Sequence, residues 1–155
     1  MKNVSILMYL KSRKNAKQEN PIYLRLTVDG KRVDERFGEV FFTRSGIGGP
    51  IILDMSSRIR DALKQGTVKL LLDLKPAVAV DLFDKRLQRE FAEHSNHEFG
   101  HSLGKLLPRD MIPVFLRLVG IDPKKKCHSV TRAERQRLLT LFKAFELTVS
   151  GCKGF

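Results

Sequence analysis

Apolar and polar residues alternate along the first half of the chain, and this period of two predicts a sheet. Residues 4–10 form an apolar run that is typical of a strand, whereas residues 11–20 are polar without an apolar period and predict a loop. The segment that follows places alternate apolar side chains on one face, at Ile22, Leu24, Leu26 and Val28.

A hairpin is expected directly after this strand. Asp29-Gly30 favours a two-residue turn because both positions accept positive φ. Val33 and residues 37–42 supply the return strands, and residues 67–74 a further one. The first half is therefore predicted to be an antiparallel sheet curled into a small β-barrel.

The period changes to that of a helix beyond Pro76. Leu82 or Phe83, Leu87 and Phe91 recur at the spacing of an amphipathic helix. The stretch of residues 106–122 predicts a second helix, in which Pro108 is a plausible first position and Gly120 a plausible stop. Pro113 should kink or delay that helix because it removes a backbone donor.

A third helix is predicted from a capping box. Thr131 and Glu134 stand three residues apart, ahead of a helical apolar stripe. The stripe consists of Leu138, Leu139, Leu141, Phe142 and Phe145. A short strand over residues 146–149 and a glycine-rich exit close the chain, and this ending suggests a piece of a longer protein.

These elements predict an α+β fold. We expect a β-barrel subdomain from residues 1–76 and 146–155, and a helical-bundle subdomain from residues 77–145.

The charge is +12 at neutral pH, and its distribution adds to this picture. Residues 1–36 carry a net +5 and residues 105–137 a net +6, whereas residues 37–104 are neutral. Such blocks attract RNA, DNA or another polyanion, and a nucleic-acid-binding module is therefore an alternative function, but a solvated surface that keeps the protein soluble is the favoured explanation. The candidate nucleic-acid contacts are Lys11, Arg13, Lys14, Lys17, Arg25, Lys31, Arg32, Lys124, Lys125 and Lys126.

Neither a membrane span nor a secretory leader is expected, because no run of 18 apolar residues and no basic-then-apolar start occurs in the chain.

Cys127 and Cys152 lie far apart and form no CxxC motif, so two reduced thiols in a cytoplasmic protein are favoured over a disulfide.

Three glycines, Gly46, Gly48 and Gly49, predict a loop between a strand and a helix, which is a common place for a phosphate. The pattern is neither a Walker motif nor a dinucleotide-binding GxGxxG. A sharp backbone corner is therefore favoured over a phosphate site.

Histidines and nucleophiles give no self-sufficient catalytic set. His94, His97 and His101 would share one face of a continuous helix and could ligate zinc, but Gly100 interrupts that helix. A solvated polar face is favoured, and no metal site or catalytic residue is assigned. Ser45 lies outside a GxSxG elbow, and neither cysteine has a histidine that the sequence places beside it.

Several motifs resemble those of the BaiN-like family of bacterial FAD-dependent oxidoreductases. In order they are "KNVS", "DGKRVDERFGEVFFTRSGIGGPIILDMSSRI", "DLKP", "LGKLLPRDM", "LVGID" and "LTVSGCKGF". The family is expected to show GE-x-LFTH-x-G-x-SGP-x-IL, a later LLP, and TV-x-G-x-x-GF. This chain departs from that pattern at Arg44, where a histidine is usual, and at Gly48, where a serine is usual.

The resemblance implies that this chain is the domain inserted into a flavin-binding core, which is the expected partner. FAD, together with NAD(P)H as a further candidate cofactor, would belong to the parent protein, and the isolated chain is expected to be inactive. The resemblance also implies a loop facing the cleft, made of Thr43, Arg44, Ser45, Gly46, Gly48, Gly49 and Pro50. Gly151 and Gly154 are the implied hinge to the core.

Overall fold

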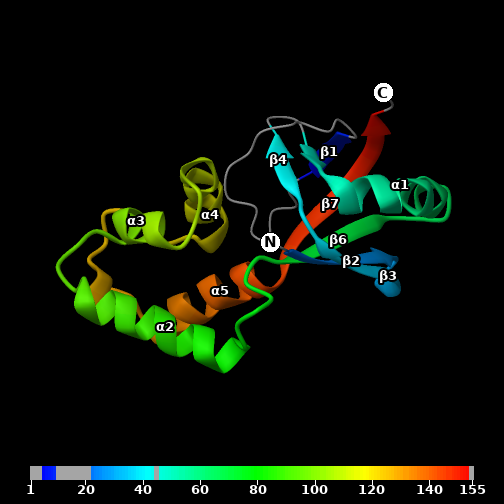
Figure 1. Ribbon diagram of the computed structural model, residues 1–155. Coiled ribbons are helices and arrows are strands. Elements are labelled where there is room, and N and C mark those ends of the chain that lie inside the picture. The colour runs from blue at the N-terminus through cyan, green and yellow to red at the C-terminus, as the bar shows by residue number, and fades with distance from the viewer. Residues whose placement is uncertain (1–4, 10–21, 44–45, 154–155) are drawn as a thin grey trace. The chain divides into compact units, whose positions relative to one another are not determined.

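The computed structural model describes residues 5–9, 22–43 and 46–153 (Figure 1). The chain divides into two compact units. The described residues up to 76 and from 142 onward form one, which we call the sheet unit, and residues 77–141 form the other, the helical unit.

Strands of the sheet unit build a five-stranded sheet and a separate hairpin. The strands are β1 (Ser5–Tyr9), β2 (Ile22–Val28), β3 (Lys31–Gly38), β4 (Phe41–Thr43), β5 (Gly46–Gly48), β6 (Val68–Asp73) and β7 (Phe145–Lys153). The order in the large sheet is β1-β7-β6-β2-β3, and β4 pairs with β5 in the hairpin. Neighbours are antiparallel except β1 and β7, which run parallel.

The turn between β2 and β3 forms where the sequence predicts it. Asp29 and Gly30 have φ values of 47° and 79°. The Asp29 carboxylate accepts the Thr67 backbone N–H at 3.0 Å, which ties the turn to the start of β6. A register shift after Leu26 leaves Val33 without a partner on β2, and the Val33 side chain is 46% exposed.

Helix α1 (Pro50–Leu63) covers the sheet (Figure 1). It contacts β2, β3, β6 and β7, and its apolar stripe, which includes Ile52, Met55 and Ile59, is fully buried. Alternate residues of β6 are buried in the same core because side chains alternate between the two faces of a strand.

The helical unit contains three α-helices, all but the last two residues of a fourth, and three short 3₁₀ turns. They are α2 (Val80–Glu93), α3 (Phe99–Ser102), α4 (Ile112–Val119) and α5 (Arg132–Lys143), with η1 (Leu103–Lys105), η2 (Arg109–Met111) and η3 (Cys127–Ser129). Phe83, Leu87 and Phe91 of α2 face the core, whereas Leu82 is 59% exposed. The Phe91 and Phe99 rings meet edge-to-face at 5.9 Å.

Local signals set the end of α4 and the start of α5 as the sequence predicts. Pro108, expected at the first helical position, instead precedes the 3₁₀ turn Arg109–Met111, and α4 begins at Ile112 with Pro113 in its first turn. Gly120 ends α4 with φ 66°. The capping box is present at α5, because Thr131 Oγ1 accepts the Glu134 N–H at 3.2 Å and Glu134 Oε2 accepts the Thr131 N–H at 2.8 Å.

Two expectations about local structure are wrong. Residues 46–48 form β5, not a loop, because they pair with β4. The last strand extends over Phe145–Lys153 and runs through Gly151, because its parallel pairing with β1 continues as far as Lys153. Phe145, expected on the third helix, therefore begins this strand.

Within the sheet unit, the end of β6 contacts Phe142 and Lys143, which are the last two residues of α5. The Lys143 ammonium lies 2.7 Å from Asp73 Oδ2 and donates to the Lys75 carbonyl at 3.0 Å. The Leu74 N–H donates to the Phe142 carbonyl at 2.9 Å. Both side chains of the ion pair are less than one-fifth exposed, so these contacts are well shielded from water.

The α+β class predicted from the sequence is confirmed by this arrangement. None of the helices in the described part of the chain is long and apolar enough to cross a membrane. Cys127 and Cys152 are both free thiols, as the sequence predicts.

Candidate functional site

The β4–β5 hairpin and the start of α1 form a tight corner. Gly49 has φ 127°, and a Cβ built on it would lie 2.5 Å from the Glu39 carbonyl oxygen. Its own carbonyl accepts the Leu53 N–H at 3.0 Å, which closes the first turn of α1. Pro50 occupies the first helical position, where a missing N–H costs nothing. This corner therefore requires glycine at position 49.

Five of the seven residues expected to face the cleft lie in or beside this corner. Thr43 ends β4, Gly46 and Gly48 lie in β5, Gly49 is the N-cap of α1, and Pro50 is the first residue of that helix. The three glycines are buried and Pro50 is exposed. Arg44 and Ser45 are outside the described residues. The first turn of α1 has neither an acidic residue nor a side-chain cap, so its backbone dipole is free to favour an anion.

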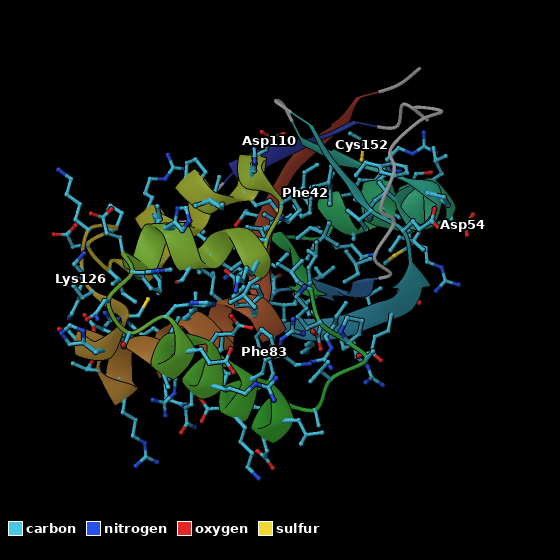
Figure 2. The ribbon with its side chains drawn as sticks, turned by 60° about the vertical axis from the view of Figure 1, so that its left-hand side comes forward. Phe42, Asp54, Phe83, Asp110, Lys126 and Cys152 are labelled. Carbon is cyan, nitrogen blue, oxygen red and sulfur yellow. The ribbon has the colours of Figure 1, made fainter. Side chains whose placement is uncertain are left out.

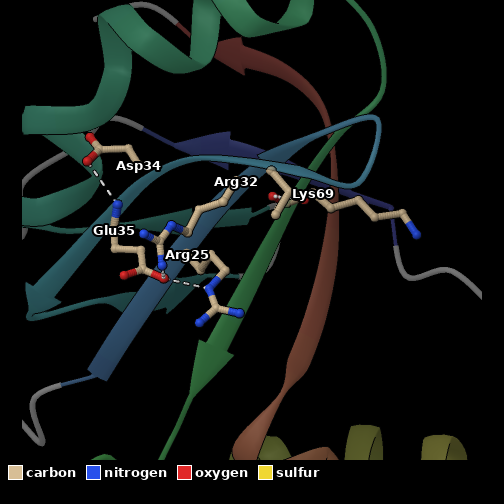
Figure 3. A network of polar contacts seen from close by, with 6 residues as sticks. Arg25, Arg32, Asp34, Glu35 and Lys69 are labelled. Carbon is tan, nitrogen blue, oxygen red and sulfur yellow. Dashed lines mark hydrogen bonds and ion pairs between the residues drawn. The ribbon is translucent and has the colours of Figure 1, made fainter.

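Basic residues of the sheet converge on one carboxylate (Figure 3). Glu35 Oε1 accepts Arg25 Nε–H at 2.7 Å and an Arg32 guanidinium N–H at 3.1 Å. Lys69 pairs with Glu146 at 2.7 Å. The candidate nucleic-acid contacts on this sheet are thus partly neutralised, and Lys31 is exposed. Lys11, Arg13, Lys14 and Lys17 lie outside the described residues.

The three histidines do not share a continuous helix, because α2 ends at Glu93 and α3 begins at Phe99. His94 stacks on His97 with ring centroids 5.1 Å apart, and His97 meets His101 edge-on at 6.2 Å.

A different set of candidate ligands stands on α2. Ligand atoms of Glu90, Glu93 and His94 lie within 4.8 Å of one another. However, the Lys105 ammonium contacts His94 Nε2, one of the two ring nitrogens that could ligate a metal, and lies 4.0 Å from Glu90 Oε2. The arrangement therefore favours a cluster of ion pairs, in which the positive charge comes from lysine.

Helices α4 and α5 are joined by two consecutive turns. The first spans residues 122–125, where Asp122 accepts the N–H groups of Lys125 and, through its side chain, of Lys124. The second is η3, closed by the N–H of Val130 donating to the carbonyl of Cys127. Lys126, between these turns, extends from one edge of the helical unit (Figure 2). We call residues 109–137 the helix–two-turns–helix segment. It runs from η2 through α4 and both turns into the first half of α5.

An open pocket of ≈ 270 Å³ lies between α2, η3 and α5. Phe91 and the buried Cys127 contribute apolar surface, while Ser95, His128 and Arg135 are polar. The Ser95 carbonyl lies 2.8 Å from His128 Nδ1, so this histidine is held by a hydrogen bond to the backbone.

The charged forms of two carboxylates, Asp84 and Glu134, are stabilised in the helical unit. The hydrogen bond from Arg135 to Asp84, with a length of 2.8 Å, lowers the pKa of Asp84. The Lys125 ammonium, 2.8 Å from Glu134 Oε1, and the Thr131 N–H lower the pKa of Glu134. Because both pKa values are depressed by folding, the stability they contribute is present at neutral pH and is lost as the pH falls through the folded-state values.

Replacing Asp84 by asparagine is expected to cost about 1–3 kcal/mol at neutral pH, since Arg135 loses a charged partner. The variant should also lose less stability than the original chain between about pH 5 and about pH 3. Urea unfolding followed by circular dichroism measures both effects. Glu93→Gln is the control, because the Arg89–Glu93 pair is exposed and 3.9 Å long. An equal cost in both variants would contradict the account.

Neither cysteine has the environment of an activated nucleophile. Burial raises the pKa of the Cys152 thiol, which keeps it protonated at neutral pH despite the nearby Arg60. Cys127 is 2% exposed.

Sequence reasoning missed the partners that neutralise the charges. Glu35 faces Arg25 across two strands, and Asp84 meets Arg135 across 51 positions of sequence. The first pairing depends on the register shift after Leu26, because the Asp29-Gly30 turn alone would place Arg25 opposite Asp34. No local pattern predicts the second, because it depends on how α2 packs against α5.

Residues 21–155 match the family described as the HI0933-like protein barrel and H2TH domain. The chain belongs to this family. The match confirms the resemblance seen in the sequence, since this domain is the insert of HI0933-like and BaiN-like flavoproteins. A helix, two turns and a helix are also what the structure shows between Ile112 and Lys143. A search of curated proteins finds no match for this chain.

Proposed function

We propose that this chain is the substrate-covering insert of an FAD-dependent oxidoreductase and that it is not catalytic by itself. The observation that carries the proposal is the family match over residues 21–155. The chain lacks the GxGxxG pattern with which a flavin-binding core holds FAD, so we assign FAD, and NAD(P)H if it is the electron donor, to the parent protein.

The corner at the start of α1 is the part of the chain that we propose faces the flavin and its substrate. Its support is the uncapped first turn of α1, which favours an anionic group such as a substrate carboxylate. In this proposal Thr43 to Pro50 line the cleft, with Arg44 as the positive side chain. The tight approach of Gly49 to the Glu39 carbonyl keeps this corner in one conformation.

We propose that the inserted domain consists of two subdomains, one made mainly of strands and one made of helices. Residues 1–76 and 146–155 form the barrel subdomain, residues 77–145 the helical subdomain, and both together are one inserted domain. Gly151 lies within β7, and we propose that it acts together with Gly154 where the chain returns to the flavin core. We expect the protein to work in the cytoplasm, where both cysteines stay reduced.

Flavin binding tests the proposal. The 155-residue chain is titrated with FAD, separated from free flavin, and examined by visible absorbance. We expect a colourless protein without stoichiometric flavin, whereas the full-length flavoprotein should retain one FAD. One FAD bound tightly to this chain alone would overturn the proposal.

A further inference from the structure

The helix–two-turns–helix segment carries positive charge that the described residues do not balance. Its exposed cations are Arg109, Arg117, Lys124, Lys126, Arg132 and Arg137. Arg137 donates to the Val119 carbonyl, which is neutral, and the charge of Arg132 acts on Asp84. The other four, Arg109, Arg117, Lys124 and Lys126, form no ion pair among residues 5–9, 22–43 and 46–153. These side chains are therefore available to an anionic partner.

Two of the three acidic groups of the same segment are engaged by other residues of the segment. The Glu134 carboxylate accepts hydrogen bonds from the Lys125 ammonium and from the Thr131 N–H. The Asp122 carboxylate accepts one from the Lys124 N–H. Asp110 is the third acid of the segment, against eight Lys and Arg residues. The imbalance is confined to this part of the helical unit, because residues 37–104 are neutral.

The backbone that carries Lys124 and Lys126 is fixed by hydrogen bonds to the start of α3 and to His97 before it. The Lys125 carbonyl accepts the Phe99 N–H at 2.7 Å, and the Pro123 carbonyl accepts the Gly100 N–H at 2.9 Å. The Cys127 N–H donates to the His97 carbonyl at 3.0 Å. Two lysines are thus presented from a rigid backbone, which reduces the entropy lost when they bind.

We propose that this segment binds double-stranded nucleic acid through its phosphodiester backbone, without reading the base sequence. A duplex is favoured over a single strand because the segment has no exposed Phe, Tyr or Trp to stack on a base: its Phe115 is fully buried. A membrane surface is disfavoured because the large apolar side chains exposed among the described residues, Val33, Val80 and Leu82, lie outside the segment.

The experiment is a salt titration of binding by the 155-residue chain. Fluorescence anisotropy is measured with random-sequence DNA and RNA duplexes, a single-stranded RNA and phosphatidylserine vesicles, between about 50 and 200 mM salt. The double variant Lys124→Gln/Lys126→Gln should bind either duplex at least about tenfold more weakly at low salt. The slope of the logarithm of its binding constant against the logarithm of salt concentration should be smaller in magnitude by about 2, since each phosphate contact contributes about 0.9.

A matched control removes two positive charges from α2. Lys85→Gln/Arg89→Gln has the same net charge as the test variant, and both residues are exposed in the same unit. This control should leave the slope unchanged, and circular dichroism should show both variants folded. The proposal is overturned if neither duplex binds at low salt, if single strands or vesicles bind more tightly, or if both variants weaken binding equally.

Discussion

Alanine at position 49 is expected to destabilise the sheet unit by about 2–4 kcal/mol, the sum of backbone strain and a steric clash. Gly49 has φ 127°, which residues with a side chain rarely adopt. A Cβ there would also lie 2.5 Å from the Glu39 oxygen, which belongs to the backbone and cannot rotate away. Urea unfolding followed by circular dichroism measures the loss.

The control for this prediction is Gly30→Ala in the β2–β3 turn. Gly30 also has positive φ, 79°, but a Cβ there meets nothing within 4 Å. Only the strain remains, so we expect a cost of about 1 kcal/mol. If Gly49→Ala costs no more than Gly30→Ala, then the corner relaxes and does not hold the start of α1 in one place.

Leu87→Ala is expected to cost about 2–5 kcal/mol in the helical unit, because it opens a cavity in the core. Leu87 is 0% exposed and lies between Phe83 and Phe91 on the buried stripe of α2. Alanine is a good helix former, so the loss arises from packing and not from helix propensity. Chemical unfolding of the chain reports the loss directly.

Leu82→Ala is the matched control, since it makes the same substitution on the same helix. Leu82 is 59% exposed, and its truncation should change the free energy of unfolding by less than about 0.5 kcal/mol. Equal costs at positions 82 and 87 would mean that α2 turns a different face towards the core.

Local chemistry made much of the fold predictable from the sequence. Asp29-Gly30 forms the predicted turn, and Thr131 with Glu134 forms the predicted capping box. In each case the deciding interactions join residues at most three positions apart. The alternation in β6 and the helical spacing in α2 likewise report which face is buried.

Contacts between distant segments account for what the sequence did not reveal. Glycine composition predicted a loop at Gly46 and an exit at Gly151, yet pairing with β4 and with β1 makes both segments strands. Within the candidate site, the corner was located correctly, but the approach of Gly49 to Glu39 depends on the path of the chain before β4. The approach of Lys105 to His94 likewise has no local signal.

The central claim is that this domain covers a flavin held by another part of the protein. Flavin content and turnover are best compared in three proteins: the full-length flavoprotein, the same protein with residues 21–155 replaced by a short linker, and the isolated chain. The account predicts one FAD in the first two, none in the third, and turnover in the first alone. Loss of FAD on excision together with FAD binding by the isolated chain would contradict it.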